Sequence, residues 1–227
     1  MRAVYPLEVV SGHLIAQIGD TRAFLDTGAP ISIGRGRLSI LDRTVALHPE
    51  GQGFTLEYMT DKIGTRVDAL LGTDVLSGLF FEVDYGQATC TFDTERGQAV
   101  GCRVPLQQFL NTPIVYAAID GEPVRMIVDT GAHLGYLAPS LVAGRRPFER
   151  RHDFNPALGD FTTDVYQVTV VVGGLTMSLP FGVMPPALEM MTRMIGTPGI
   201  LGSDIFRHHK TLFAMPDGEL VFSDATG

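Results

Sequence analysis

The chain has 227 residues, enough for one large domain or two small ones around a buried core. Its hydrophobic content of 45% and charged content of 19% are those of a globular protein, which excludes a largely disordered chain. The net charge is −8, and no run of Lys or Arg exceeds two residues, so we expect neither nucleic acid nor an anionic membrane as a partner.

The N-terminal sequence has no continuous apolar stretch of the kind found in a signal peptide, and we expect a cytoplasmic protein. The only cysteines, Cys90 and Cys102, fit neither a metal ligand set nor a disulfide framework, and we expect two reduced thiols. The six histidines show no metal-binding spacing. The sequence therefore predicts no metal site and no cofactor.

In chain order, the first half of the sequence predicts β structure. Residues 3–10 are expected to form a strand that shares one sheet with a C-terminal strand at 219–223. Residues 14–25 read as a hairpin that runs into the motif FLDTGA. A short apolar strand follows at 68–72 (DALLG), then about two turns of helix at 74–80 and a second hairpin at 81–92. Helical patterns are sparse, so a mainly β fold is predicted.

The second half repeats these elements in the same order. A hairpin at 115–128 runs into IVDTGA, and an apolar strand at 198–202 (PGILG) precedes a short helix at 203–210 and a hairpin at 212–222. Three elements recurring in one order indicate a duplicated unit. We call residues 12–92 the first repeat and residues 113–223 the second repeat.

The second repeat is 27 residues longer between its Asp-Thr-Gly and its Leu-Gly. The extra residues predict two strands around the turn NPALGD within 150–168, followed by another strand after a Gly-Gly turn. Residues 139–144 and 186–194 contain helix-forming sequence. In the first repeat the corresponding interval has only one obvious loop, at 48–54.

The two Asp-Thr-Gly motifs suggest a chemistry. Asp26 and Asp129 each sit on a tight glycine turn, where a carboxylate faces a cleft and accepts hydrogen bonds from backbone N–H groups. Two carboxylates brought face to face share one proton, because both cannot ionise comfortably. Such a pair offers a base for a water molecule and an acid for an amide carbonyl.

The paired motifs LDTGA and VDTGA, followed by LLG at 70–72 and ILG at 200–202, resemble the aspartic peptidases of the retropepsin/pepsin clan. The resemblance covers most of both repeats. It implies a mainly β, two-lobed fold with pseudo-twofold symmetry and few short helices, with lobes at 1–102 and 103–227. Because one chain holds both motifs, it also implies a monomer with a complete site.

The resemblance implies that Asp26 and Asp129 form the catalytic dyad of an aspartic endopeptidase acting on peptide or protein substrates. In this clan the threonines hydrogen-bond across the two halves, and the glycines let the backbone approach the carboxylates. The supporting loop positions are Thr27, Gly28, Ala29, Thr130, Gly131 and Ala132. The clan covers its cleft with a hairpin, which the longer second repeat places at 150–168.

Alanine follows each Asp-Thr-Gly, where pepsins carry a hydroxyl that supports the ionised Asp. Ala29 and Ala132 cannot donate a hydrogen bond from their side chains, so we expect the pKa values of the pair to be higher and the activity optimum to lie at about pH 5 to 7.

Other readings of the sequence stay open. The same fold can serve a catalytically inactive peptide-binding module, or a subunit used only for assembly. Asp74 and Asp204 recur in both repeats, and we expect them to cap short helices rather than act in catalysis. His133 is expected to be a loop residue beside the second motif. Four methionines either line an adaptable cleft wall or fill the core: Met184, Met190, Met191 and Met194.

Overall fold

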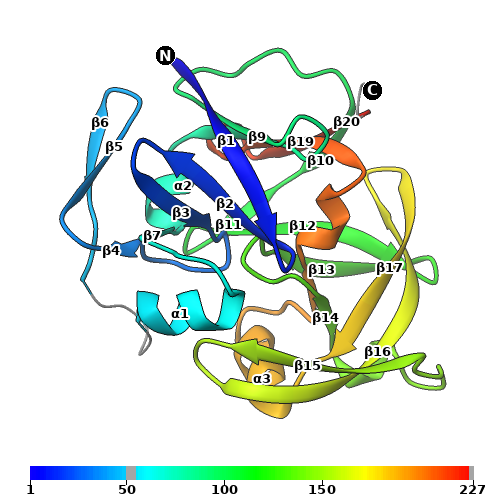
Figure 1. The fold of residues 1–227 in the computed structure, drawn as a ribbon. Coiled ribbons are helices and arrows are strands. Elements are labelled where there is room, and N and C mark those ends of the chain that lie inside the picture. The colour runs from blue at the N-terminus through cyan, green and yellow to red at the C-terminus, as the bar shows by residue number, and fades with distance from the viewer. Residues whose placement is uncertain (50–54, 225–227) are drawn as a thin grey trace.

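The computed structural model describes residues 1–49 and 55–224, and it is mainly β (Figure 1). The loop expected at 48–54 lies largely outside the described residues. The strands of the first repeat and its surroundings are β1 (Arg2–Val10), β2 (His13–Ile18), β3 (Thr21–Leu25), β4 (Ile33–Gly34), β5 (Arg37–Ile40), β6 (Arg43–Ala46), β7 (Ala69–Leu71), β8 (Phe80–Asp84) and β9 (Thr89–Asp93). The later strands are β10 (Cys102–Pro105), β11 (Gln107–Phe109), β12 (Thr112–Ile119), β13 (Glu122–Val128), β14 (Gly135–Leu137), β15 (Glu149–Asn155), β16 (Gly159–Val172), β17 (Leu175–Val183), β18 (Gly199–Leu201), β19 (His209–Ala214) and β20 (Glu219–Asp224).

One ten-stranded sheet joins the two ends of the chain. Its order is β10-β20-β19-β8-β9-β1-β2-β3-β7-β4, so strands from both repeats lie side by side. Figure 1 shows the N-terminus and the C-terminal strand β20 at the same end of the molecule. The prediction that residues 3–10 and 219–223 form strands of one shared sheet is confirmed.

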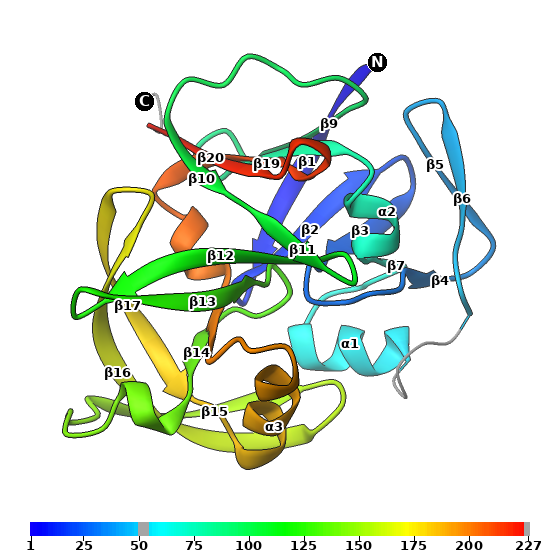
Figure 2. The ribbon, with the colours of Figure 1, turned by 180° about the vertical axis from the view of Figure 1, so that it is seen from behind.

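A second sheet of eight strands belongs to the second repeat and its flanks, in the order β11-β12-β13-β18-β14-β17-β16-β15. Its edge is the long hairpin β15–β16, in which Glu149 to Asn155 pair with Gly159 to Val165. The hairpin predicted around NPALGD is therefore present. In Figures 1 and 2 its tip reaches beneath helix α1 (Leu56–Ile63).

Each repeat positions its aspartate in the same way. Strand β3 pairs in parallel with β7, and β13 pairs in parallel with β18. The ladder continues past the strand ends, because Asp26 N donates to Leu71 O at 3.0 Å and Asp129 N donates to Leu201 O at 2.9 Å. The Leu-Leu-Gly and Ile-Leu-Gly segments thus fix the backbone of the two aspartates, as expected.

The helices agree with the sequence prediction in part. Helix α1 was not predicted, whereas the helix-forming sequence at 186–194 does form α3 (Pro186–Met194). The predicted two-turn helices are shorter, namely α2 (Thr73–Leu76) and the 3-10 turn Ser203–Phe206. A further 3-10 turn at Pro139–Leu141 lies inside the predicted 139–144 segment, and another spans Met215–Asp217.

The capping prediction for Asp74 and Asp204 is wrong, because the N-cap positions are glycines, Gly72 and Gly202. Asp74 instead accepts hydrogen bonds from the backbone N–H and the hydroxyl of Ser32, at 3.0 and 2.6 Å. The carboxylate of Asp204 pairs with the guanidinium of Arg207 at 2.6 Å. Asp204 also lies 3.4 Å from Nε2 of His133, so both aspartates contact a neighbouring segment rather than capping a helix.

The core of the shared sheet is aromatic. Phe81 of β8 faces Phe213 of β19 across the ladder, and their rings stack with centroids 4.2 Å apart and planes 8° apart. Both side chains are fully buried. Cys90 is buried nearby in the same sheet and Cys102 is half-buried, and both are free thiols. Across residues 1–49 and 55–224, no helix is long and apolar enough to cross a membrane.

Because the Phe81–Phe213 stack joins strands from the two repeats, we predict that Phe213→Ala lowers the free energy of unfolding by about 3–5 kcal/mol. Phe148, which is 57% exposed, supplies the matched control, and Phe148→Ala should cost less than about 1 kcal/mol. Urea denaturation measures both values. Equal losses in the two variants would contradict a core role for the stack.

Candidate active site

The two Asp-Thr-Gly loops hold their carboxylates in matching environments. Asp26 Oδ1 accepts hydrogen bonds from the N–H groups of Gly28 and Ala29, at 2.9 and 3.0 Å. Asp129 Oδ1 accepts from Gly131 and Ala132, at 2.8 and 3.1 Å. Backbone donors fix one oxygen of each carboxylate, and the two carboxyl groups are hydrogen-bonded to each other.

Only glycine fits beside this pair. A Cβ atom on Gly28 would lie 2.5 Å from Cγ of Asp129, and one on Gly131 would lie 2.3 Å from Cγ of Asp26. Real Cβ contacts are not that short, so a side chain at either position would displace the opposite carboxylate. Each glycine therefore makes room for the aspartate of the other repeat.

The two threonines connect the loops at the base of the site. Thr27 N donates to Thr130 Oγ1 and Thr130 N donates to Thr27 Oγ1, both at 3.0 Å. Each hydroxyl in turn donates to a carbonyl of the opposite repeat, Thr27 to Val128 at 2.6 Å and Thr130 to Leu25 at 2.8 Å. Both threonines are fully buried, so all four bonds are shielded from water.

We predict that Thr130→Val lowers the free energy of unfolding by about 2–4 kcal/mol, because valine keeps the shape but leaves Thr27 N and Leu25 O without partners. Thr130→Ser is the matched control, since it keeps the hydroxyl and should retain most of the stability. Thermal denaturation of the two variants gives the comparison. A valine variant as stable as the serine variant would show that these bonds are not needed.

The electrostatics of the pair favour one shared proton. Burial raises the pKa of Asp26 well above its ordinary value, and the neighbouring charge of Asp129 raises it further. Burial also raises the pKa of Asp129, but the Gly131 and Ala132 N–H groups and the bond from Asp26 oppose this. Backbone N–H groups oppose the rise at both aspartates, so the pair as a whole retains one proton and carries one negative charge.

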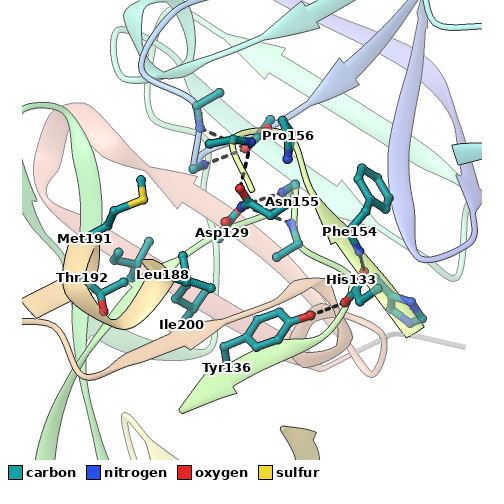
Figure 3. Close-up of a pocket in the computed structure, with 18 of the residues that line it drawn as sticks. Asp129, His133, Tyr136, Phe154, Asn155, Pro156, Leu188, Met191, Thr192 and Ile200 are labelled. Atoms are coloured by element: carbon teal, nitrogen blue, oxygen red, sulfur yellow. Dashed lines mark hydrogen bonds between the residues drawn. The ribbon is translucent and has the colours of Figure 1, made fainter. Parts of the chain in front are cut away.

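The carboxylates open into a cleft of about 270 Å³ with mainly apolar walls. One wall comes from the hairpin β15–β16, through Phe154, Asn155 and Pro156. The opposite wall comes from α3, through Leu188 and Met191. Figure 3 shows Asp129 between the two, with Met191 and Leu188 on one side and Phe154 and His133 on the other.

The hairpin is held over the cleft by contacts with the first repeat. Phe154 packs into the apolar cluster of Met59 and Ile63, and its ring lies 6.2 Å from that of Tyr58. Asp160 forms an ion pair with Lys62 of α1, with Nζ 2.6 Å from Oδ1. Beside Phe154 in the same strand, Asp153 accepts a hydrogen bond from the hydroxyl of Tyr136. The prediction that the second repeat supplies the segment over the site agrees with these contacts.

A residue that sequence reasoning missed is His13, at the start of β2. Its Nδ1 lies 2.9 Å from the carbonyl oxygen of Gly131, so Nδ1 carries the hydrogen and donates it to the loop of the other repeat. The ring packs against Phe24 and Phe154 in the cleft. The only signal in the sequence is the position of His13 directly after the turn Ser11-Gly12. In the second repeat Thr112 takes the same position after the turn Leu110-Asn111, and all four turn residues have positive φ.

The pKa of His13 is lowered to about 4, mainly by burial and to a smaller extent by His133, while the Gly131 bond and the charge of Asp153 oppose the shift. The unfolded chain therefore binds more protons than the folded protein between about pH 6.5 and 4. Stability contributed by the neutral ring is present above pH 6.5 and is lost as the pH falls to 4.

We predict that this loss amounts to at most about 3 kcal/mol in the free energy of unfolding. His13→Asn keeps an N–H donor near the position of Nδ1 but does not titrate, so its unfolding free energy should fall less than that of the wild type between pH 7 and pH 4. Urea denaturation at the two pH values measures the difference. Parallel curves for the two proteins would mean that His13 does not titrate in this range.

The remaining candidates are placed as follows. His133 lines the cleft, and its Nε2 lies 2.9 Å from the Arg207 guanidinium. Met184 is buried in the core of the second repeat, whereas Met191 lines the cleft. Met190 and Met194 are exposed on α3. Within the described part of the chain, no group of three or more His, Cys, Asp or Glu side chains is placed to hold a metal ion.

One comparison with known proteins found a match. Residues 115–205 match a family model described as an aspartyl protease, a range that includes the Asp129 loop and the strand β18. A search of curated proteins found no match. The family match supports an aspartyl protease family and a protease-type function, with peptides or proteins as the class of substrate.

Proposed function

We propose that the chain is an aspartic endopeptidase of the retropepsin/pepsin type that is complete in one chain. The observation that carries this proposal is the pair of hydrogen-bonded carboxyl groups, Asp26 and Asp129, on two equivalent loops at the floor of an apolar cleft. The family match covers only the second of these loops. The equivalent contacts of the first loop support the same role for it.

The geometry supports a reaction without a covalent intermediate. A water molecule between the carboxyl groups of Asp26 and Asp129 gives a proton to the ionised one while its oxygen attacks the peptide carbonyl, and the protonated one gives its proton to the carbonyl oxygen. The C–N bond of the tetrahedral intermediate then breaks as the carboxyl that took the water proton gives it to the amine nitrogen. A hydroxyl of the intermediate gives its proton to the other carboxylate and becomes part of the new carboxyl product. The pair ends the cycle with one shared proton, as it began.

We further propose a two-lobed molecule with pseudo-twofold symmetry, with lobes at 1–102 and 103–227 that meet at the threonine bonds and the shared sheet. The equivalent pairing of β3 with β7 and of β13 with β18 supports this symmetry. Each lobe supplies one aspartate, so a monomer needs no partner to complete the site. A catalytically inactive peptide-binding module is the alternative, and the intact carboxyl pair favours the enzyme.

We predict that Asp26→Asn and Asp129→Asn each reduce peptide cleavage by several orders of magnitude, because one acid and one base are both required. Neither variant should be less stable than the wild type at pH 7. The folded pKa values of the pair are raised, so the wild-type pair loses stability as the pH rises through them, and an uncharged Asn avoids that loss. Cleavage of an unfolded protein substrate and thermal denaturation supply the two readouts.

A mixture of the two Asn variants provides the control for a single-chain site. Each variant lacks one half of the acid–base pair, so the mixture should stay inactive if both aspartates act within one molecule. Restored cleavage in the mixture would place the site between two chains and would contradict the monomer proposal. Near-wild-type cleavage by either variant alone would favour the binding-module alternative.

We predict a bell-shaped pH profile with a maximum at about pH 5 to 7. Burial raises both pKa values, and the side chains of Ala29 and Ala132 donate no hydrogen bond to the carboxylates. A double substitution, Ala29→Ser with Ala132→Ser, adds hydroxyl donors that favour the ionised form and should shift the profile toward acid. An optimum near pH 2 to 3 in the wild type would show that other groups set these pKa values.

A further inference from the structure

Helices α1 and α3 are a fourth repeated element. Residues 56–65 read LEYMTDKIGT and residues 188–197 read LEMMTRMIGT, and the two segments differ at only three of these positions. A glycine with positive φ follows each helix, Gly64 at 81° and Gly196 at 67°. Each segment then leads into the apolar strand that supports an aspartate, β7 or β18. The two helices are therefore equivalent in the duplicated unit.

The same helix face is covered in α1 and open in α3. Met59 is 2% exposed, whereas its counterpart Met191 is 48% exposed. On α1 the cover is the hairpin β15–β16, whose Phe154 packs with Met59 and Tyr58. In Figure 1 α3 lies behind this hairpin, and in Figure 2 it lies in front of it.

The three differing positions follow this division. On α1, Tyr58 and Lys62 contact Phe154 and Asp160 of the hairpin. On α3 the corresponding residues are Met190 and Met194, which are 64% and 83% exposed. The third position changes Asp61 to Arg193. Thus α1 carries an aromatic ring and a cation for the hairpin, and α3 carries two flexible apolar side chains in their place.

The methionine face, formed by Met190, Met191 and Met194, is continuous with the cleft. Met191 lines the cleft beside Leu188, across Asp129 from Phe154 (Figure 3). Met190 is its neighbour in the chain, and Met194 lies one helical turn beyond Met190. Met190 and Met194 line a separate hollow next to the cleft, together with Pro186, Glu189 and Arg193. The methionines therefore form an apolar strip, flanked by charged side chains, that leads from the cleft outward along α3.

We propose that the methionine face is an outer substrate-binding surface. An apolar segment of an extended polypeptide binds to this face of α3, at the position equivalent to the one that the hairpin β15–β16 occupies on α1. The inference rests on the proposed function, because the cleft must bind a peptide for the segment to reach α3. Unbranched thioether side chains adapt to varied apolar partners, so the surface selects apolar character rather than one sequence. The class of substrate is an unfolded polypeptide with an apolar stretch outside the cleaved centre.

Binding to the inactive Asp26→Asn protein tests this surface separately from cleavage. The first probe is a fluorescent hexapeptide with a Leu-Phe centre. The other probes are dodecapeptides that extend the hexapeptide at one end or the other, either with an apolar extension of Leu and Val or with a polar extension of Ser and Asn. At one end, the apolar extension should lower Kd by about tenfold relative to the polar extension. Adding Met190→Ser with Met194→Ser should abolish that difference and leave the hexapeptide Kd unchanged.

Val100→Ser is the control, since Val100 is an 89% exposed apolar residue outside α3, and it should leave every Kd unchanged. Equal affinities for the apolar and polar extensions, or an unchanged difference in the double methionine variant, would overturn the proposal. So would a wild-type dimer that the double variant disrupts in sedimentation, because the occupant would then be a second copy. Failure of the proposed function appears elsewhere, as wild-type protein that binds these peptides but cleaves none of them.

Discussion

Two carboxyl groups that face each other in a half-buried site are the constraint on which the rest of this structure depends. Both cannot ionise there, so the pair keeps a proton, and each carboxylate needs backbone N–H donors to bear its share of charge. Those donors come from Gly28, Ala29, Gly131 and Ala132, on turns that only glycine allows at this separation. The loops in turn depend on the buried threonine bonds.

The surroundings of this symmetric centre are not symmetric. A single hairpin, from the second repeat, covers α1 through Phe154 and the Lys62–Asp160 ion pair. A single imidazole, His13 from the first repeat, holds a carbonyl of the second Asp-Thr-Gly loop. The two repeats supply equal sets of backbone donors for the carboxylates, whereas the residues in which they differ give the two sides of the cleft different walls.

The sequence allowed prediction of the elements that carry local signals. The Asp-Thr-Gly loops, their hairpins and the supporting strands have fixed turn chemistry and apolar runs, and the structure contains them all. Helix α1 was not predicted, although residues 56–65 match residues 188–197 of the α3 segment at seven of ten positions. The repeat signal was there, but propensity alone did not separate a short helix from its β neighbours.

Contacts between segments distant in the chain could not be predicted in the same way. The bond from His13 to Gly131 joins residues 118 positions apart, and nothing in the local sequence of either residue indicates it. The capping error for Asp74 and Asp204 has the same origin, because each contacts a residue of another segment, Ser32 for Asp74 and His133 for Asp204. Residue type and helix position favoured a cap, and tertiary contact with a better donor decided otherwise.

The asymmetry of the walls has a consequence for any extended peptide in the cleft. A peptide has a direction, whereas a centre with twofold symmetry presents the same groups to either direction. Here one side of the Asp pair is closed by Phe154 and His13, and the other side is open along Met191 of α3. The two orientations of a bound chain therefore meet different contacts and differ in free energy. The two carboxyl groups have equivalent contacts, so the unequal walls alone give the cleft its polarity.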